Sequence, residues 1–156
     1  MRTAARALRK EDWDLVLTSP LGRARETAEI IAGQLGFDEI HQQELLIERS
    51  FGEAEGLAYD QWKSKYSNLD QIPGGESKSE LTARSKLLLQ TFASTHPGKR
   101  ILAISHGALI RTVLAISSAN ELPREGERLG NASLNIVSHQ ESSWAVTKYD
   151  LDPLSS

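Results

Sequence analysis

The stretch Arg100-Ile-Leu-Ala-Ile-Ser-His106-Gly-Ala-Leu-Ile-Arg-Thr-Val-Leu114 decides the fold class of this chain. Its first part, Ile101 to Ile104, is short and apolar and follows the Pro97-Gly98 turn signal, which is typical of a strand covered on both faces in an α/β sheet. Its second part has apolar residues at helical spacing. His106 lies at the junction, where α/β folds bind ligands and where helix amides favour an anion. The alternative is a histidine that only caps the helix.

The composition limits the classes of function. With 156 residues the chain fits one domain, residues 1–156, with a sizeable core. The formal net charge of −3 gives no basic excess to hold nucleic acid or an acidic membrane face, so we expect neither partner. Cysteine is absent, which excludes disulfides and thiolate metal sites. No run approaches the roughly 20 apolar residues of a membrane helix, and the amino terminus lacks the apolar core of a signal peptide. We therefore expect a cytoplasmic protein.

An earlier part of the chain repeats the pattern of strand, turn and helix. Trp13 to Ser19 has the β-branched and aromatic content of a strand, and Pro20 ends it. Leu21 to Leu35 is a predicted helix with Gly36 as its stop. Arg23 in its first turn can direct its guanidinium group into the crevice, where a phosphate would accept two parallel hydrogen bonds. For an arginine alone, a solvated helix face is the more common alternative.

A carboxylate follows the apolar run Leu45 to Ile47, which the sequence leaves open as a short strand or an extended segment. Burial beside this run would raise the pKa of Glu48 and let it transfer a proton near neutral pH. The alternative is an ordinary surface acid paired with Arg49.

The remaining segments complete an α/β pattern. Tyr59 to Leu69 is a predicted short helix, and Ser77 with Glu80 forms a predicted capping box. Ala132 to Ser138 and Ser143 to Asp150 alternate as a final pair of strands. The helix after the capping box, residues 81–93, is expected to direct four side chains to the core: Leu81, Leu87, Leu88 and Phe92.

With these residues in place, the sequence resembles the histidine phosphatase superfamily, also called the phosphoglycerate mutase-like family, in its small phosphatase branch. Five motifs in the right order carry the resemblance. They are Ser19-Pro-Leu-Gly-Arg23-Ala-Arg-Glu-Thr27-Ala, Glu48-Arg-Ser-Phe-Gly-Glu-Ala-Glu-Gly, Pro73-Gly-Gly-Glu-Ser, Ser105-His106-Gly and Asn131-Ala-Ser133.

The resemblance implies a fold and a chemistry. The fold is a three-layer sandwich in which helices flank a mostly parallel sheet. The chemistry is phosphoryl transfer through a phosphohistidine on a small phosphorylated metabolite, with no metal or other cofactor. Arg23 would clamp the phosphate, His106 would hydrogen-bond the transferring phosphoryl group, and Glu48 would act as acid and base. The resemblance adds three substrate-binding residues: Ser19, Gly107 and Asn131.

The chain departs from the family in one respect. It contains no Arg-His-Gly, the motif of the family's nucleophile, and Met1 to Leu8 resembles the tail of the helix that follows that motif. We therefore expect a domain truncated at its N-terminus that lacks the first strand. An unpaired edge would then remain on a strand such as Leu15 to Thr18 or Ile101 to Ile104, and a homodimer could cover it.

The expected function is a metal-independent phosphatase whose activity is impaired because the nucleophile is missing. His41, His96 and His139 lack the flanking pattern of a substitute. One alternative is a non-catalytic module that binds phosphate or a partner. A phosphoglycerate mutase is less favoured, because the region between Gly56 and Pro73 leaves little room for a longer insertion.

Overall fold

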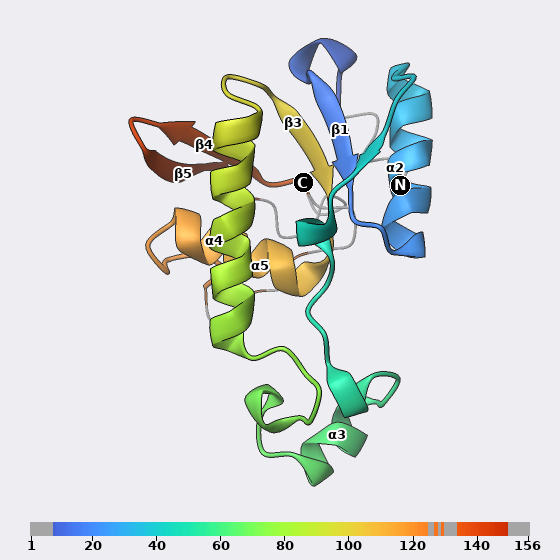
Figure 1. Ribbon diagram of the computed structural model, residues 1–156, viewed down its shortest axis with the longest axis vertical. Coiled ribbons are helices and arrows are strands. Elements are labelled where there is room, and N and C mark those ends of the chain that lie inside the picture. The colour runs from blue at the N-terminus through green and yellow to red at the C-terminus, as the bar shows by residue number, and fades with distance from the viewer. Residues whose placement is uncertain (1–7, 125–126, 128, 130–133, 150–156) are drawn as a thin grey trace.

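A parallel sheet of three strands is the centre of the structure. The computed structural model describes residues 8–124, 127, 129 and 134–149. The strand order is β2 (His41–Gln42), β1 (Leu15–Thr18) and β3 (Ile101–Ile104), with β1 in the middle and both pairings parallel. Helix α2 (Gly22–Leu35) lies on one side of the sheet, and α4 (Lys78–Thr95) and α5 (Gly107–Ser117) lie on the other (Figure 1). The expected three-layer α/β arrangement is confirmed.

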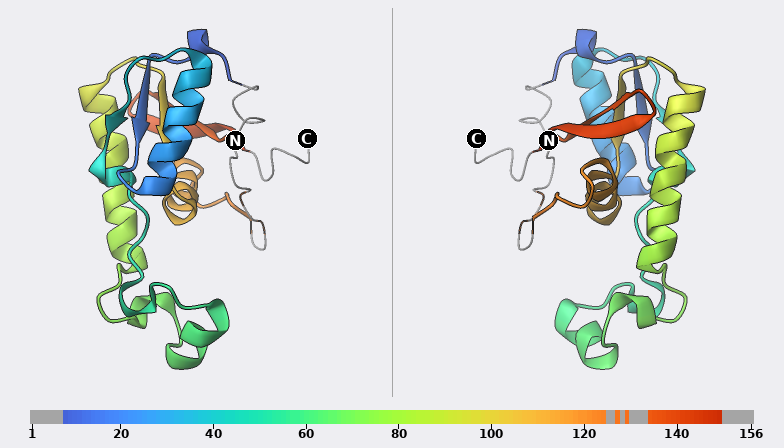
Figure 2. Two further views of the ribbon diagram at one scale, coloured as in Figure 1. Left: turned by 90° about the vertical axis from the view of Figure 1, so that its right-hand side faces the viewer. Right: turned by 90° about the vertical axis from the view of Figure 1, so that its left-hand side faces the viewer.

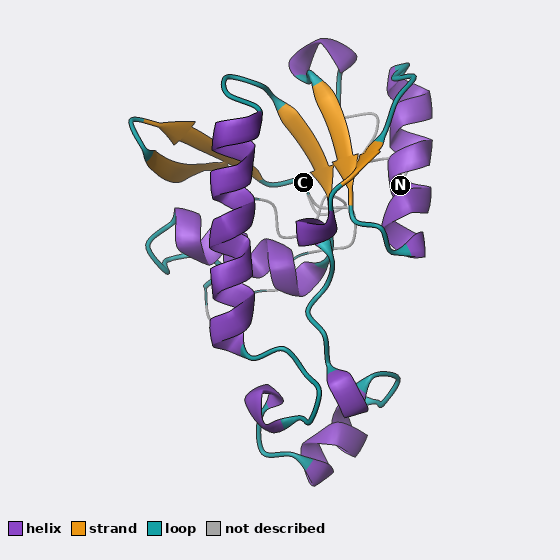
Figure 3. Cartoon of the chain, in the orientation of Figure 1, coloured by secondary structure: helices purple, strands orange, loops and turns teal. Residues whose placement is uncertain are grey.

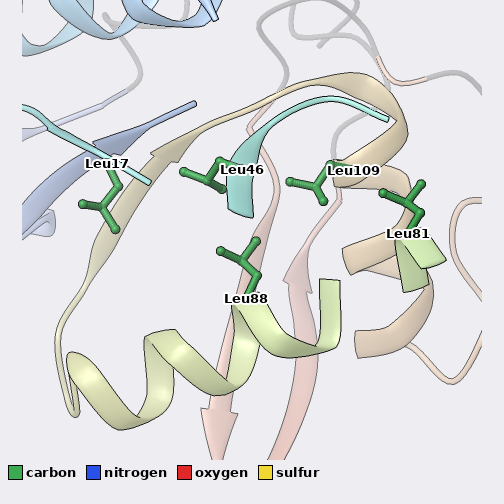
Figure 4. Close-up of a cluster of buried hydrophobic side chains, with 5 residues drawn as sticks. All are labelled: Leu17, Leu46, Leu81, Leu88 and Leu109. Atoms are coloured by element: carbon green, nitrogen blue, oxygen red, sulfur yellow. The ribbon is translucent and has the colours of Figure 1, made fainter. Parts of the chain in front are cut away.

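Two apolar clusters hold the layers together. Successive side chains of a strand point to opposite faces. Accordingly Val16 packs with Ile31 of α2, while Leu17 belongs to a cluster with Leu88 and Leu109 on the other face (Figure 4). Both β1 residues are at most 4% exposed. The central strand is thus covered on both faces, as is typical of a buried parallel strand.

The helix ends follow their local chemistry. Gly36 ends α2 with a φ of 85°, in the left-handed region where glycine has no Cβ penalty. Ser77 and Glu80 form the predicted capping box at the start of α4. The prediction that Leu87 of this helix points to the core is wrong, since Leu87 is 50% exposed. Leu89, two positions later, is buried.

The segment between α2 and Glu48 differs from the sequence prediction. It contains the short strand β2, which the sequence does not indicate, and the 3-10 helix η2 (Glu44–Leu46) instead of a strand or an extended run. The side chain of Gln43 accepts a hydrogen bond from the Leu45 amide, and the Gln43 amide donates to the Thr18 carbonyl. These bonds turn the chain away from the sheet directly after it has paired with β1.

An arm of short helices projects from the sheet (Figures 1 and 2). It contains η3 (Gly52–Ala54), α3 (Tyr59–Lys65) and η4 (Leu69–Gln71), so the helix predicted from Tyr59 to Leu69 is two shorter pieces. The arm is closed at its base by a bridge between Phe51 and Gly75. Gly52 has a φ of 52°, and a Cβ atom on it would lie 2.3 Å from the Pro73 carbonyl oxygen. Only glycine allows this close approach.

A separate antiparallel hairpin, β4 (Ile136–Gln140) and β5 (Ser143–Lys148), follows α5 (Figure 3). A cavity of about 650 Å³ lies between the residues of β4 and those of β3. In the described part of the chain β3 pairs only with β1, and Ala103 is exposed. The strand is therefore an edge strand. Leu102 packs into the cluster on the α2 side and Ile101 against the cluster on the other side, but Ala103 is exposed, so the predicted cover on both faces is present and incomplete.

The amino-terminal region is described only from Leu8 onward. Leu8 is buried in the same cluster as Val16, and the 3-10 helix η1 (Lys10–Asp12) leads into β1. The expected helix at Met1 to Leu8 lies almost wholly outside the described residues. Among the helices that the structure describes, none is long and apolar enough to cross a membrane.

Candidate functional site

The register of the sheet brings the two predicted polar turns together. Thr18, the last residue of β1, is paired with Ile104, the last residue of β3. The amide of Ser19 donates to the Ile104 carbonyl at 2.9 Å, which extends the pairing by one step. Because parallel strands end at the same edge, Ser19 and His106 meet at the carboxyl end of the sheet.

His106 is the residue at the centre of the site. It precedes the first turn of α5, is 9% exposed, and its Nε2 lies 2.8 Å from the hydroxyl oxygen of Ser19. Its ring makes no capping hydrogen bond to α5, so the alternative of a simple helix cap does not apply. Burial lowers the pKa of His106 below the ordinary value of 6.5, with smaller effects from two charges.

Those two charges are the predicted partners Glu48 and Arg23. The carboxylate of Glu48 raises the pKa of His106, and the guanidinium of Arg23 lowers it. Arg23 lies in the first turn of α2, as the sequence predicts, where its side chain is exposed and its charge still acts on the buried ring. The fold thus brings together three residues that are separated by 25 and 58 positions in the sequence.

Glu48 is half-buried and is held by backbone amides. Its Oε1 accepts from the Arg49 amide at 2.9 Å, and its Oε2 accepts from the Ala108 amide, in the first turn of α5, at 3.4 Å. The guanidinium group of Arg49 pairs instead with Asp70 at 2.9 Å. The alternative of a surface acid paired with the Arg49 side chain is therefore wrong, and Glu48 faces the amino end of the same helix that follows His106.

The three further predicted ligand residues differ in position. Gly107 is the exposed first residue of α5, with open space around a notional Cβ atom. Ser19 is fully buried, and its hydroxyl contacts His106 and the Leu21 amide. Asn131 lies outside the described residues. The substrate contacts predicted for Gly107 and Asn131 stay predictions, whereas the Ser19 hydroxyl is buried and contacts His106 instead.

Sequence reasoning missed the side chain that fixes the segment before Glu48. Arg84 on α4 donates from Nη1 to the carbonyls of Leu45 and Ile47, at 2.9 and 2.8 Å. Its Nε and Nη2 bind the carboxylate of Glu76. In the sequence Arg84 is one polar residue among others on a helix, and no local pattern indicates a target almost forty residues earlier.

The site combines elements suited to an anion. The first amides of α5 are donors at the positive end of a helix dipole, and Arg23 adds an exposed cation. His106 adds a ring that burial favours in its neutral form. Within residues 8–124, 127, 129 and 134–149, no group of three or more His, Cys, Asp or Glu side chains could hold a metal ion.

The molecule is thus a three-layer α/β protein with polar side chains gathered where two parallel strands end. The family model described as "Histidine phosphatase superfamily (branch 1)" matches residues 1–152 of this chain. The chain belongs to this superfamily, and with it to a family of phosphoric monoester hydrolases.

Curated relatives carry the names of phosphatases and mutase-like proteins. The uncharacterized phosphatase PhoE of Bacillus subtilis is 32% identical over 140 residues, which cover 90% of this chain and 72% of that protein. The metal-independent phosphoserine phosphatase of Arabidopsis thaliana is 32% identical, with coverages of 97% and 68%. Phosphoglycerate mutase-like protein 4 of the same plant is also 32% identical, with coverages of 86% and 63%.

Solved structures share the fold. Bacillus stearothermophilus YhfR superposes with a TM-score of 0.84 at 23% identity, covering 97% of this chain and 81% of that chain. A mutant of phosphoserine phosphatase from Entamoeba histolytica, in which a histidine is replaced by alanine, was solved in complex with phosphoserine. It gives a TM-score of 0.70 at 26% identity, with coverages of 95% and 78%.

Proposed function

We propose that this chain is a metal-independent phosphatase that binds a small phosphomonoester at the carboxyl ends of β1 and β3. The observation that carries the proposal is the position of His106 and Glu48 at the amino end of α5, with the Arg23 charge in the first turn of α2 acting on the His106 ring. Each of these residues supplies something that phosphoryl transfer needs: a hydrogen-bond donor, a proton donor or acceptor, and a positive charge.

In this proposal each residue has a separate role. Arg23 holds the phosphate through its guanidinium fork, and the Gly107 amide adds a donor at the start of α5. His106 hydrogen-bonds the phosphoryl oxygens as charge spreads over them. Glu48, fixed by two amides, gives a proton to the leaving oxygen and afterwards takes one from water.

The proposal includes weak turnover. The chain contains no Arg-His-Gly, and its other histidines lie on β2 (His41), at the end of α4 (His96) and on β4 (His139). In a hydrolase that loses its nucleophile, the rate falls on the order of a millionfold, and about a thousandfold acceleration over water survives. A binding site can survive the loss of a histidine, since the histidine-to-alanine mutant from Entamoeba histolytica holds phosphoserine.

The test separates binding from turnover. For the purified chain, calorimetry would measure the binding of inorganic phosphate. A second assay would measure the hydrolysis of an aryl phosphate in the presence of a metal chelator. Arg23→Ala and His106→Ala should each weaken phosphate binding about tenfold or more, because charge-assisted hydrogen bonds are lost. Arg25→Ala is the matched control, since Arg25 is an exposed arginine on the same helix. Equal binding by all four proteins would overturn the proposal.

The second candidate is a non-catalytic phosphate-binding module. It is favoured because, in the described part of the chain, His106 is the only histidine at the site and no second histidine is present as a nucleophile. Phosphate binding with no turnover above background in the chelator assay would select it. A homodimer that covers an unpaired strand edge, which among the described residues lies on β3 and not on the central β1, stays a prediction, as does a cytoplasmic location. Sedimentation of the purified chain tests the first of them.

A further inference from the structure

The hydroxyl group of Ser19 lies too deep to touch a ligand directly. Ser19 is 0% exposed, because the pairing of its amide with the Ile104 carbonyl holds it at the end of the sheet. Its Oγ lies 2.8 Å from Nε2 of His106, and both residues are buried. Any effect of Ser19 on a bound phosphate must therefore pass through the histidine ring.

The other hydrogen bonds of the Ser19 hydroxyl determine whether it donates to Nε2 of His106 or accepts from it. The Leu21 amide donates to Oγ of Ser19 at 3.3 Å, so the hydroxyl already accepts once. The hydroxyl also has one proton to donate. If Nε2 of His106 carried a proton, Oγ would accept twice, and its own buried proton would have no acceptor among the described residues. An unmade buried hydrogen bond is unfavourable, whereas donation from Ser19 to an unprotonated Nε2 satisfies every group.

We propose that Ser19 is a positioning residue that holds His106 in the neutral form protonated on Nδ1, so that Nδ1–H is the donor offered to the phosphoryl oxygen. The tautomer of a histidine is set by the hydrogen bond that its other nitrogen makes. The identity of the ligand rests on the proposed function, whereas the tautomer belongs to the free protein. Ser19 thereby acts on the site without contacting the substrate.

The charges around the ring fit this assignment. Burial disfavours the imidazolium form, Arg23 on α2 disfavours it further, and Glu48 in the segment after η2 opposes both. A neutral ring near pH 7 has one proton for two nitrogens. The hydrogen bond from Ser19 therefore determines which nitrogen remains a donor.

The tautomer can be measured without any ligand. Long-range proton–nitrogen correlation spectra of the labelled chain at pH 7.5 distinguish protonated from unprotonated ring nitrogens, and His106→Gln identifies the signals of His106. The expected result in wild type is a protonated Nδ1 and an unprotonated Nε2. Ser19→Ala should shift both nitrogens toward the other tautomer, and Ser19→Thr, which keeps a hydroxyl, should restore them.

Ser85→Ala is the matched control. Ser85 is also a fully buried serine, but its hydroxyl has no hydrogen-bond partner among the residues that the structure describes, so its removal should leave the spectrum of His106 unchanged. The pKa of His106 should rise in Ser19→Ala, since the hydrogen bond that favours the neutral ring is lost, and should stay unchanged in Ser85→Ala.

Two results would overturn the inference: a protonated Nε2 in wild type, or an unchanged tautomer in Ser19→Ala. The wild-type spectrum decides the first even if the variant does not fold. Failure of wild type to bind inorganic phosphate would instead count against the proposed function and leave the tautomer result standing.

Discussion

Arg84 and Glu76 form a two-point ion pair between α4 and the base of the arm. Nε of Arg84 lies 2.8 Å from Oε2 of Glu76, and Nη2 lies 2.9 Å from Oε1. Both side chains are only 16% exposed. The same guanidinium group binds the carbonyls of Leu45 and Ile47, so one side chain connects the arm, the core helix and the segment that ends at Glu48.

Arg84→Ala should lower the free energy of unfolding by about 2–4 kcal/mol, because it leaves a poorly solvated carboxylate and two carbonyls without their donor. Urea denaturation followed by circular dichroism measures the change. Arg100→Ala is the control, since it breaks the exposed pair with Asp14 and should have a much smaller effect. Equal losses in the two variants would contradict the assignment.

The stability of the chain should fall in acid partly through Glu76. The hydrogen bonds from Arg84 hold the pKa of Glu76 below its ordinary value of 4.5. A carboxyl group whose pKa is depressed by folding stabilises the protein above the unfolded value, and this stabilisation is lost as the pH falls toward the folded value. Glu76→Gln should therefore flatten the decline of stability below pH 4.5. Glu29→Gln, on the exposed face of α2, should leave the decline as in wild type.

The pKa of His106 should respond in opposite directions to its two charged neighbours. Arg23→Ala removes a cation that lowers the pKa of His106, so the pKa should rise. Glu48→Gln removes an anion that raises it, so the pKa should fall. Titration of the His106 ring by NMR measures both shifts, with Arg25→Ala as a control that should move the pKa little. Shifts of the same sign in the two variants would show that the ring is not flanked by both charges.

Two adjacent leucines of α4 should differ sharply in their contribution to stability. Leu88 is 2% exposed within the cluster of Figure 4, whereas Leu87 is 50% exposed. Leu88→Ala should destabilise the protein by about 2–5 kcal/mol through lost burial and a cavity. Leu87→Ala should stay within about 0.5 kcal/mol. Chemical denaturation of both variants checks the prediction, and comparable losses would place Leu87 in the core after all.

The strand-to-helix units were predictable because their signals are local. A short apolar strand, a polar turn and a periodic apolar helix adjoin one another at Ser19 and again at His106, and Gly36 marks a helix end by its own backbone preference. The position of Arg23 in the first turn of its helix follows from the same pattern. The parallel order of the strands then follows from the helices that connect them.

The contacts between distant segments were not predictable in this way. The sequence shows neither that Arg84 reaches the carbonyls before Glu48 nor that the Ser19 hydroxyl contacts His106, since the first contact depends on how the layers pack and the second on the register of two strands. The 3-10 turn η2 replaces the expected short strand or extended segment because Gln43 binds the Leu45 amide, a bond that apolar periodicity cannot reveal. Leu87 has the hydrophobicity of its neighbours, and its exposure follows from the precise rotation of α4.

The closed base of the arm makes the length of the arm independent of the rest of the molecule. Phe51 and Gly75 form a bridge at the base of the arm, and the contact of Gly52 with Pro73 fixes how closely the two ends approach, while Arg49 binds Asp70 after the exposed stretch. Each doubling of a flexible loop adds only about 0.6 kcal/mol of closure entropy. Extra residues could thus be inserted in the exposed stretch around Ser67 and Asn68 without moving Glu48. The arm is a segment in which size can diverge, or be engineered, while the geometry of the candidate site is kept.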